Sequence, residues 1–535
     1  IYTPIVIDRN HAFTKVDGVL FKQMLKMLSL DFICNYDSLI LKDTKKINKL
    51  AFALDMAVAG RSDESGWIRQ AQEIRKQMTD SLIDSAFTYL PEGVKHDEIE
   101  LIKRKLKRRR LELEAVASQY YRLLQRTPVV AGTNQSDYFL IERQAPDRTI
   151  LRIYDPETGD CRLEQQFSGR ETKELWLYGL AGNDTFEVKG NTRKDFPIYL
   201  ISGEGENQYQ LNHNRKIHVY DKDYKYDYQK IKYHKISFTP WGIYDSDKGI
   251  SLGTFFTYTM YGFKRAPFTY QHRIGYNYLK GFMYAGVFPN YDGRRRLYLN
   301  ASISSPRNFE NFFGFGNNTA GYKEEKKNYN RVKLRTYMLN PSFEMDLRKE
   351  EVVTFFGSLD MYKAKRTDDR YIYTVYGEDH PIFRTNYFVG LGATYRITKQ
   401  PYSWLPLLET EWTAGWKMNL KKPERNFPYA QGSLSWNVRF SDRFTWASLM
   451  KGTVLFDNDY EFYQAATIDL RGFRDNRFIG KQSFYQYSDL RLDMGKLKNP
   501  FTPLKYGLFA GFDYGRVWFP GERSHSWHTS YGGGI

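Results

Sequence analysis

Two short stretches near the end of the chain decide its fold: Leu470-Arg471-Gly472-Phe473 and Gly511-Phe512-Asp513-Tyr514-Gly515. The second stretch lies in a segment whose residues alternate between two faces. The faces are Leu508, Ala510, Phe512 and Tyr514, and Phe509, Gly511, Asp513 and Gly515. This period of two predicts a half-buried β-strand. Glycines beside a carboxylate indicate that the second face meets water or a polar lumen, where Arg471 on a long loop would be a bidentate partner for Asp513.

The same alternation continues through most of the second half of the chain. Segments of about ten residues recur, which is the length that a tilted strand needs to cross a bilayer. They begin near residues 252, 267, 282, 295, 331, 352, 389, 407, 434, 444, 484, 505 and 529. A soluble sandwich would pack its apolar faces together and would rarely need so many exposed aromatic residues. The pattern therefore predicts a barrel of about thirteen strands with a polar lumen.

The composition excludes some classes of protein to which this chain could belong. The mean hydropathy is −0.62, and no run of eighteen apolar residues occurs in the 535 residues, which excludes a helical membrane protein. The formal charge of +17 comes from lysine and arginine spread through loops and one helix, so no nucleic-acid partner is predicted. Cys34 and Cys161 have no metal-ligand spacing and are compatible with an exported protein.

The order of LRGF, a polar loop, a strand and FDYG resembles the signature of the BamA/TamA-type outer-membrane barrel superfamily, the bacterial surface antigen family. In that family an arginine of the RGF-type loop folds back into the barrel and meets the aspartate of an F-x-D-x-G strand. The resemblance implies the pair Arg471 and Asp513. The motif residues are Leu470, Arg471, Gly472 and Phe473 on the loop, and Phe512, Asp513 and Gly515 on the strand.

The resemblance also implies sixteen strands, with the loop between the eleventh and the twelfth. Only three strands follow the loop here, and both ends of the chain look cut, so the last two strands of the family are expected to be missing. The predicted fold is mainly β: a truncated 16-stranded-type transmembrane β-barrel over residues 237–535, preceded by a helical segment and a small β-repeat domain.

Helical signals fill residues 44–127. Helices are predicted over 46–59, over 67–87 and from 96 onward. The first places Ile47, Leu50, Leu54 and Val58 at three- and four-residue spacing. The basic run 103–110 is either a solvated helix face or a contact for acidic headgroups at a membrane surface, with the solvated face favoured.

Residues 128–220 read as short strands with a repeated glycine-rich turn at 179–186 and 202–209, which predicts a small β-repeat domain. The first turn resembles the calcium-binding nonapeptide, so Asp184 is a weak metal candidate, although a plain β-turn is favoured. Residues 221–236, rich in Tyr and Lys, are the predicted linker and suit a membrane–water interface.

Residues 1–43 read as the end of an upstream domain. Their start is similar to the P-x-D-x-D-x-A-F stretch of CotH-like protein kinases, whose aspartates hold a metal. Asp8 matches as a second weak metal candidate, whereas Asn10 replaces the other aspartate. The alternative is a charged turn closing a domain. No catalytic motif appears, so no enzyme activity and no cofactor are predicted for this fragment.

The resemblance implies a function in protein translocation or membrane-protein assembly, or in display of the N-terminal domains. The expected location is the outer membrane, with the N-terminal region in the periplasm. The expected partners are outer-membrane lipid and either a polypeptide client or periplasmic or lipoprotein subunits. The alternative is a membrane anchor for an upstream metallophosphoesterase-like or kinase-like enzyme, as in Bacteroidetes-type fusion proteins. A passive pore would leave the paired motifs without a purpose.

Overall fold

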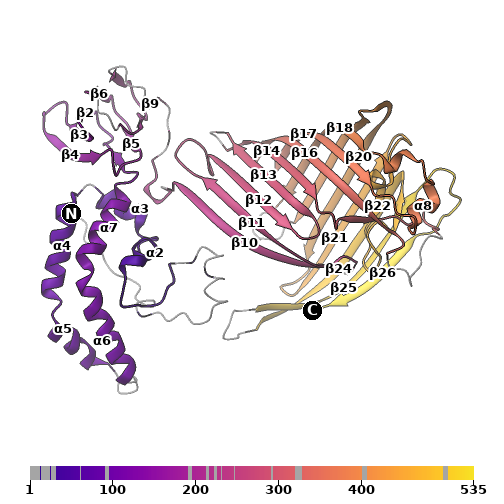
Figure 1. The fold of residues 1–535 in the computed structure, drawn as a ribbon, viewed down its shortest axis with the longest axis horizontal. Helices are drawn as coiled ribbons and strands as arrows, with labels where there is room; N and C mark the ends of the chain where they lie inside the picture. Colours follow the sequence, from indigo (N-terminus) through magenta and orange to yellow (C-terminus); the bar gives the residue numbers. More distant parts are fainter. Residues whose placement is uncertain are drawn as a thin grey trace. The chain divides into compact units, whose positions relative to one another are not determined.

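The computed structural model describes residues 13, 25, 30, 32–60, 62–90, 96–190, 195–211, 216–221, 224, 226–230, 232–245, 247–290, 293–319, 328–399, 407–497 and 504–535. The chain forms two compact units, Ile1–Lys232 and Tyr233–Ile535 (Figure 1). Their boundary lies inside the segment 221–236 that the sequence predicts as a linker. The helical and β-repeat segments belong to one unit, the first.

The first unit begins with helices. They are α2 (Thr44–Ile47), α3 (Phe52–Val58), α4 (Glu64–Gln77), α5 (Asp80–Ala86), α6 (His96–Leu111) and α7 (Leu113–Leu124), with 3₁₀ turns at Leu41–Asp43, Phe87–Tyr89 and Tyr228–Lys230. The helix predicted over 67–87 is divided because Thr79 caps a new helix, accepting a hydrogen bond from the Leu82 N–H at 3.1 Å.

The continuous helix predicted over 46–59 is wrong. α2 and α3 are separate short helices, and Ile47, Leu50, Leu54 and Val58 are all exposed, Leu50 to 72%. α3 turns its other side inward: Met56 is buried, and Asp55 accepts a hydrogen bond from the buried Tyr120 hydroxyl at 2.7 Å.

The basic run on α6 is partly paired within the unit. Lys107 pairs with Asp84 at 2.8 Å and Arg110 with Asp80 at 2.8 Å, both on α5. Lys103 pairs with Glu100, while Lys105 and Arg109 donate to the carbonyls of Tyr36 and Asp37. Arg104 and Arg108 are the exposed members. Three side chains of the run therefore have a carboxylate partner, and the helix keeps a positively charged face.

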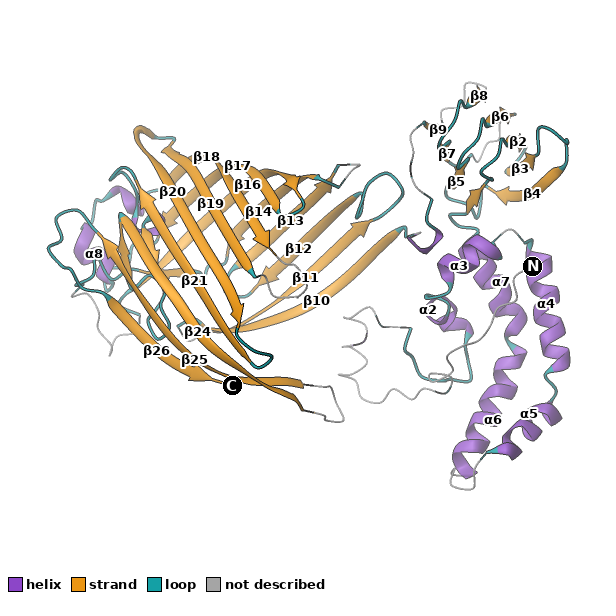
Figure 2. Cartoon of the chain, turned by 180° about the vertical axis from the view of Figure 1, so that it is seen from behind, coloured by secondary structure: helices purple, strands orange, loops and turns teal. Residues whose placement is uncertain are grey.

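The rest of the first unit is a two-sheet β-domain (Figure 2). Its strands are β1 (Val129–Ala131), β2 (Tyr138–Gln144), β3 (Arg148–Tyr154), β4 (Cys161–Ser168), β5 (Leu175–Tyr178), β6 (Thr185–Lys189), β7 (Ile198–Ile201), β8 (Gln208–Leu211) and β9 (Ile217–Tyr220). One sheet is parallel, in the order β1-β5-β7-β9, and the other has the order β4-β3-β2-β6-β8. A core of large apolar side chains from both sheets, including Phe139, Leu177 and Phe186, lies between them.

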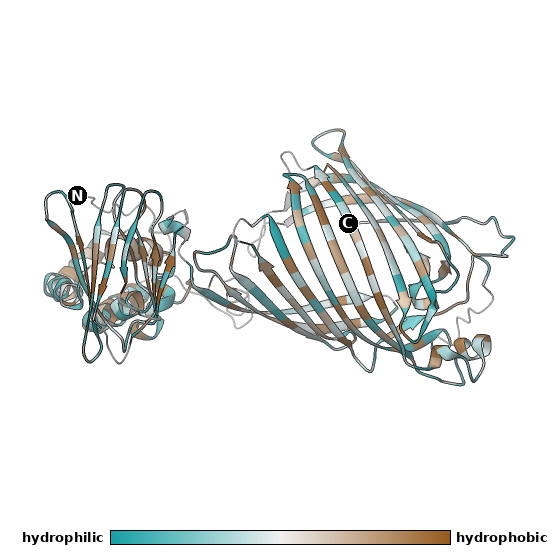
Figure 3. Cartoon of the chain, turned by 90° about the horizontal axis from the view of Figure 1, so that it is seen from above, coloured by the Kyte–Doolittle hydropathy of each residue, from teal (hydrophilic) through white to brown (hydrophobic). Residues whose placement is uncertain are grey.

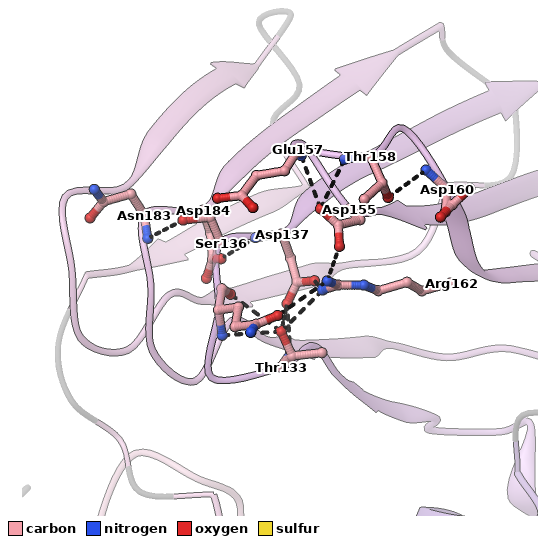
Figure 4. A network of polar contacts seen from close by, with 11 residues as sticks. Thr133, Ser136, Asp137, Asp155, Glu157, Thr158, Asp160, Arg162, Asn183 and Asp184 are labelled. Carbon is pink, nitrogen blue, oxygen red and sulfur yellow. Dashed lines mark hydrogen bonds and ion pairs between the residues drawn. The ribbon is translucent and has the colours of Figure 1, made fainter.

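The glycine-rich turns join the two sheets, and they stack. Besides the two turns noted in the sequence, residues 132–137 form a third, hidden because β3 and β4 interrupt the repeat. Figure 4 shows Asp137 and Asp184 on neighbouring turns, with Arg162 reaching Asp137. The Asp137 N–H donates to Asp184 Oδ1 at 2.9 Å, and the Asp184 N–H donates to Asn207 Oδ1 at 2.9 Å. The repeated turns therefore form a ladder of hydrogen bonds from the backbone of one turn to the side chain of the next.

The second unit is one large antiparallel sheet that curls into a barrel-like wall (Figures 1 and 2). Among the described residues its path runs through fourteen strands. In order they are β10 (His234–Asp245), β11 (Gly249–Met260), β12 (Tyr270–Asn277), β13 (Gly281–Pro289), β14 (Arg295–Ser304), β16 (Arg331–Arg348), β17 (Glu351–Ala364), β18 (Asn386–Lys399), β19 (Leu408–Asn419), β20 (Lys422–Arg439), β21 (Phe444–Leu455), β24 (Gln482–Leu497), β25 (Leu504–Trp518) and β26 (His528–Gly534). The mainly-β barrel fold predicted from the sequence is confirmed.

β10 is the strand that the sequence analysis missed. It begins inside the predicted linker and contains Pro240, which lacks the N–H that a ladder position needs. Pro240 is tolerated because β10 is the first strand of the path and pairs through β11 alone, where Pro240 lies opposite Thr254.

The outer face of this wall is apolar. Cross-strand neighbours continue around it: Phe238 faces Phe256, which faces Ile274. All three are exposed. Figure 3 shows hydrophobic bands crossing the strands of the wall. No helix among the described residues is long and apolar enough to span a membrane, a result that concerns helices and has no bearing on barrels.

Long connections gather at one end of the barrel. They hold β15 (Phe309–Asn311), α8 (Tyr371–Tyr376), the 3₁₀ turn Phe462–Gln464, β22 (Ala466–Ile468) and β23 (Phe478–Gly480). Phe312, Ile372, Phe462 and Ile479 come from three of these connections and pack in one buried cluster. The connections at the opposite end are shorter, from residues 349–350 between β16 and β17 to residues 261–269 between β11 and β12.

Candidate functional site

The Leu470–Phe473 motif lies in a small hairpin between the eleventh and twelfth strands of the path, β21 and β24. β22 and β23 pair antiparallel, with Thr467 opposite Ile479, and we call residues 471–477 between them the tip. We call residues 466–480 the inner hairpin. The sequence predicts a loop here but not these two strands, which are three residues each and too short to show a period.

The base of the inner hairpin packs against the barrel wall. Ile468, Leu470 and Phe478 are buried with Tyr485 of β24 and Val517 of β25. These wall residues lie on the face opposite the exposed Phe512. The hairpin therefore folds back onto the inner face of the wall.

Arg471 and Asp513 meet, as their motifs predict. The Arg471 Nε donates to Asp513 Oδ2 at 2.6 Å, and Nη2 donates to Asp513 Oδ1, which makes the contact bidentate. Asp513 is fully buried, whereas the Arg471 side chain is 32% exposed. Ser530 of β26 also donates to Asp513 Oδ2 at 3.2 Å. Hydrogen bonding to Asp513 raises the pKa of Arg471 above its ordinary value, so the guanidinium stays charged.

Asp489 is a partner that the sequence analysis missed. It lies on β24, and Arg471 Nη1 donates to its Oδ1 at 2.8 Å. Asp489 also pairs with Arg491 at 3.0 Å. The available signal was the alternation Tyr485, Tyr487, Asp489, Arg491, which places a carboxylate on the inner face of the strand next to Asp513. Arg471 is therefore clamped between two strands.

Two glycines make this clamp possible. Gly472 has φ +80°, a left-handed conformation that allows the chain to turn back directly after Arg471. Gly511 lies opposite Asp489 on β25, and a Cβ there would overlap the Arg471 guanidinium. The motif glycine Gly515 makes room for Tyr485, because a Cβ at position 515 would collide with that side chain. Gly511, rather than Gly515, makes room for the arginine.

The two motif phenylalanines lie outside the clamp. Phe473 is partly exposed and packs edge-on against Phe478, with ring centroids 5.3 Å apart. Phe512 is exposed on the apolar outer face. A cavity of about 450 Å³ adjoins the clamp on the inner side, and Arg471, Asp489, Arg491 and Asn437 are among its lining residues. The arrangement can hold a loop in place by charge.

The two weak metal candidates fare differently. Asp8 lies outside the described residues. Asp184 is fully buried, and its Oδ2 has no hydrogen-bond partner among the described residues. Burial and the neighbouring Asp137 carboxylate raise the pKa of Asp184 to about 7, against the lowering effect of the Asp137 N–H. Within the described residues no group of three His, Cys, Asp or Glu side chains could hold a metal ion.

No protein-family model matches the chain, and no curated protein matches it. Among solved structures the chain is similar to BamA from Haemophilus ducreyi lacking POTRA domains 1–3, at 12% identity and a TM-score of 0.38 over 54% of this chain and 58% of that chain. It is also similar to CdiB from Acinetobacter baumannii, at 12% identity and a TM-score of 0.31, covering 55% of this chain and 57% of that chain. CdiB from Escherichia coli is 10% identical, with a TM-score of 0.35, covering 60% of this chain and 58% of that chain. This chain thus spans less than two thirds of each structure.

Proposed function

We propose that this chain is an outer-membrane β-barrel protein that passes or inserts polypeptide chains, with the inner hairpin as the element that closes its lumen. The observation that carries the proposal is the clamp on Arg471. A long loop folds back inside the wall and is held there by Asp489 and Asp513.

The membrane part of the proposal rests on the outer face. Exposed apolar side chains such as Phe256, Leu359 and Trp412 cover a curled sheet of antiparallel strands. In a bilayer backbone groups must be satisfied within the protein, and the pairing of neighbouring strands satisfies them along the path between β10 and β26. Lipid is the partner that suits this face.

A periplasmic location of the first unit is supported by the difference between the two ends of the barrel. Outer-membrane barrels have short periplasmic turns and longer loops outside the cell. β10 starts at the end opposite the long connections, because it runs from His234 to the turn at 246–248, beside the loops. The linker would therefore enter from the periplasm, together with the first unit.

The polypeptide client is suggested by the first strand of the barrel. Among the described residues β10 pairs with β11 alone. A strand paired on one side presents backbone donors and acceptors to which an extended chain can add. A passive pore would not need a hairpin fixed by charge across its lumen.

A reconstitution experiment tests this function. Lipid vesicles containing the chain receive a urea-unfolded outer-membrane barrel, and the folded client is scored by its heat-modifiable migration. The wild type should speed client folding relative to vesicles that carry a folded porin. Arg471→Ala should lose this effect while still inserted, whereas Arg439→Ala should retain it, because Arg439 donates to Asp442 in its own turn.

Equal client folding with the wild type and with the porin would refute the assembly function. The barrel would then be best described as a membrane anchor, and an upstream enzyme would be the place to look for activity.

A further inference from the structure

A second arginine of the inner hairpin, Arg474, contacts the opposite edge of the sheet. Its Nε donates to Asp247 Oδ1 at 3.0 Å, and its Nη2 lies 2.9 Å from the same oxygen. Nη2 also donates to Asn311 Oδ1 at 3.2 Å. Asp247 lies in the turn between β10 and β11, the first hairpin of the barrel. The two arginines, three residues apart, therefore hold opposite ends of the strand path.

Asp247 is built into this contact. Its side chain is only 3% exposed, and besides Arg474 it accepts hydrogen bonds from Arg331 and Asn311. Burial alone would raise the pKa of Asp247, but the hydrogen bonds from Asn311 and Arg474 outweigh burial and lower it. A buried carboxylate with these donors is costly to leave without its arginine.

The neighbouring residues repeat the contact with reversed charge. Lys248 follows Asp247 in the turn, and its Nζ lies 3.2 Å from Asp475 Oδ2. The Asp475 carbonyl accepts from Asn311 Nδ2 at 3.0 Å. Two adjacent residues of the turn thus pair with two adjacent residues of the hairpin tip, acid to base and base to acid. The two oppositely oriented ion pairs make the contact between the tip and the β10–β11 turn specific.

We propose that Arg474 and Asp475 form a latch on the β10–β11 turn, and that releasing the latch frees the first hairpin from the strands at the other edge. Arg471 anchors the inner hairpin to β24 and β25, so the latch ties the first strand to the last ones through a single loop. The latch rests on the proposed function, since it would control access of a client strand to β10.

Hydrogen–deuterium exchange on the full chain in lipid nanodiscs tests the latch without a client. Arg474→Met and Asp247→Asn should each speed exchange in β10 and β11 by at least about tenfold, the factor that corresponds to a loss of about 1.4 kcal/mol. Exchange in β17 and β18 should stay as in the wild type. The double variant should be little worse than either single one, because the two residues act together.

A charge swap keeps the test informative if a buried variant fails to fold. Lys248→Asp and Asp475→Lys should each loosen the β10–β11 hairpin, since each puts like charges in contact, and the double swap should restore protection. Arg348→Glu is the matched control, because Arg348 pairs with Glu351 at a turn on the opposite end of the barrel. It should leave β10 and β11 unchanged.

The latch is refuted if β10–β11 exchange is the same in Arg474→Met, Asp247→Asn and both single swaps as in the wild type. It is equally refuted if Arg348→Glu loosens that hairpin as much as they do. A chain that shows the latch effect but does not speed client folding would keep the latch and lose the proposed function.

Discussion

Removing the Arg471 side chain should release the tip of the inner hairpin while the barrel stays folded. On the β24–β25 side, ion pairs from Arg471 to Asp489 and Asp513 hold the tip. In Arg471→Ala, the fully buried Asp513 would keep Ser530 as a donor and lose the guanidinium. The apolar base, with Ile468, Leu470 and Phe478, would remain in place.

The size of the effect follows from burial. Removing one partner of a fully buried ion pair costs about 3–5 kcal/mol, whereas an exposed pair contributes about 0–1 kcal/mol. Asp513 is fully buried, but Arg471 is 32% exposed and borders the cavity, so water reaches part of it. We therefore expect about 2–3 kcal/mol, roughly a 30- to 150-fold larger population of released tip.

Chymotrypsin cleavage after Phe473 in the inserted protein measures this population. Its rate should rise by that factor in Arg471→Ala and in Asp513→Ala, and the double variant should be little worse than either. Asp489→Ala should have a smaller effect, because the bidentate contact with Asp513 remains. Arg491→Ala is the matched control, since this lumenal arginine pairs with Asp489 and not with the hairpin. Strictly additive defects, or an Arg471→Ala tip as protected as in the wild type, would refute the clamp.

Three further predictions follow from the rest of the fold. Burial raises the pKa of Asp184 to about 7 in the folded β-domain, against about 3.9 in unfolded chains. Between pH 3.9 and pH 7, roughly, Asp184 is therefore protonated in the folded domain and ionised in the unfolded chain. Its stability should fall by up to about 4 kcal/mol as pH rises from 4 to 7, and Asp184→Asn should remove this slope in hydrogen-exchange measurements at β6. The intact protein should fractionate with outer membrane and show heat-modifiable migration; recovery as a detergent-free monomer would contradict the barrel. Proteolysis within 221–236 should release a folded, soluble first unit, and an aggregated product would mean that the unit depends on other parts of the protein.

Periodicity predicted the barrel because its wall is a single sheet, so successive residues of each strand face the outside and the lumen in turn. On β25 the large side chains Leu508 and Phe512 are exposed, while Asp513 points inward, as the alternation requires. The same rule failed for Ile47, Leu50, Leu54 and Val58. Helical spacing shows that residues share a face, but it does not show which face finds a neighbour.

The sequence predicted the contact of Arg471 with Asp513 but not its contact with Asp489. Arg471 and Asp513 stand in motifs with glycine and aromatic neighbours, so the pair could be proposed. Asp489 stands in an ordinary alternating strand, and its role depends on the register that places Gly511 opposite it. Asp247 is 227 residues from Arg474 and lies in a turn with no distinctive pattern. Contacts of this kind depend on how the sheet curls, which no local signal records.

The division of the inner hairpin into base and tip explains what can move. The base is held by apolar packing. The tip is held by ion pairs of Arg471, Arg474 and Asp475. Gly472, which has a positive φ, lies between the two arginines. Salt screens exposed pairs well and buried pairs poorly. Because Asp247 and Asp513 are both buried, ionic strength alone should not free the tip. Under the proposed function, release would come from a competing partner inside the barrel, such as the backbone or charged side chains of an entering polypeptide, and the hairpin would then respond to a client more than to ionic strength.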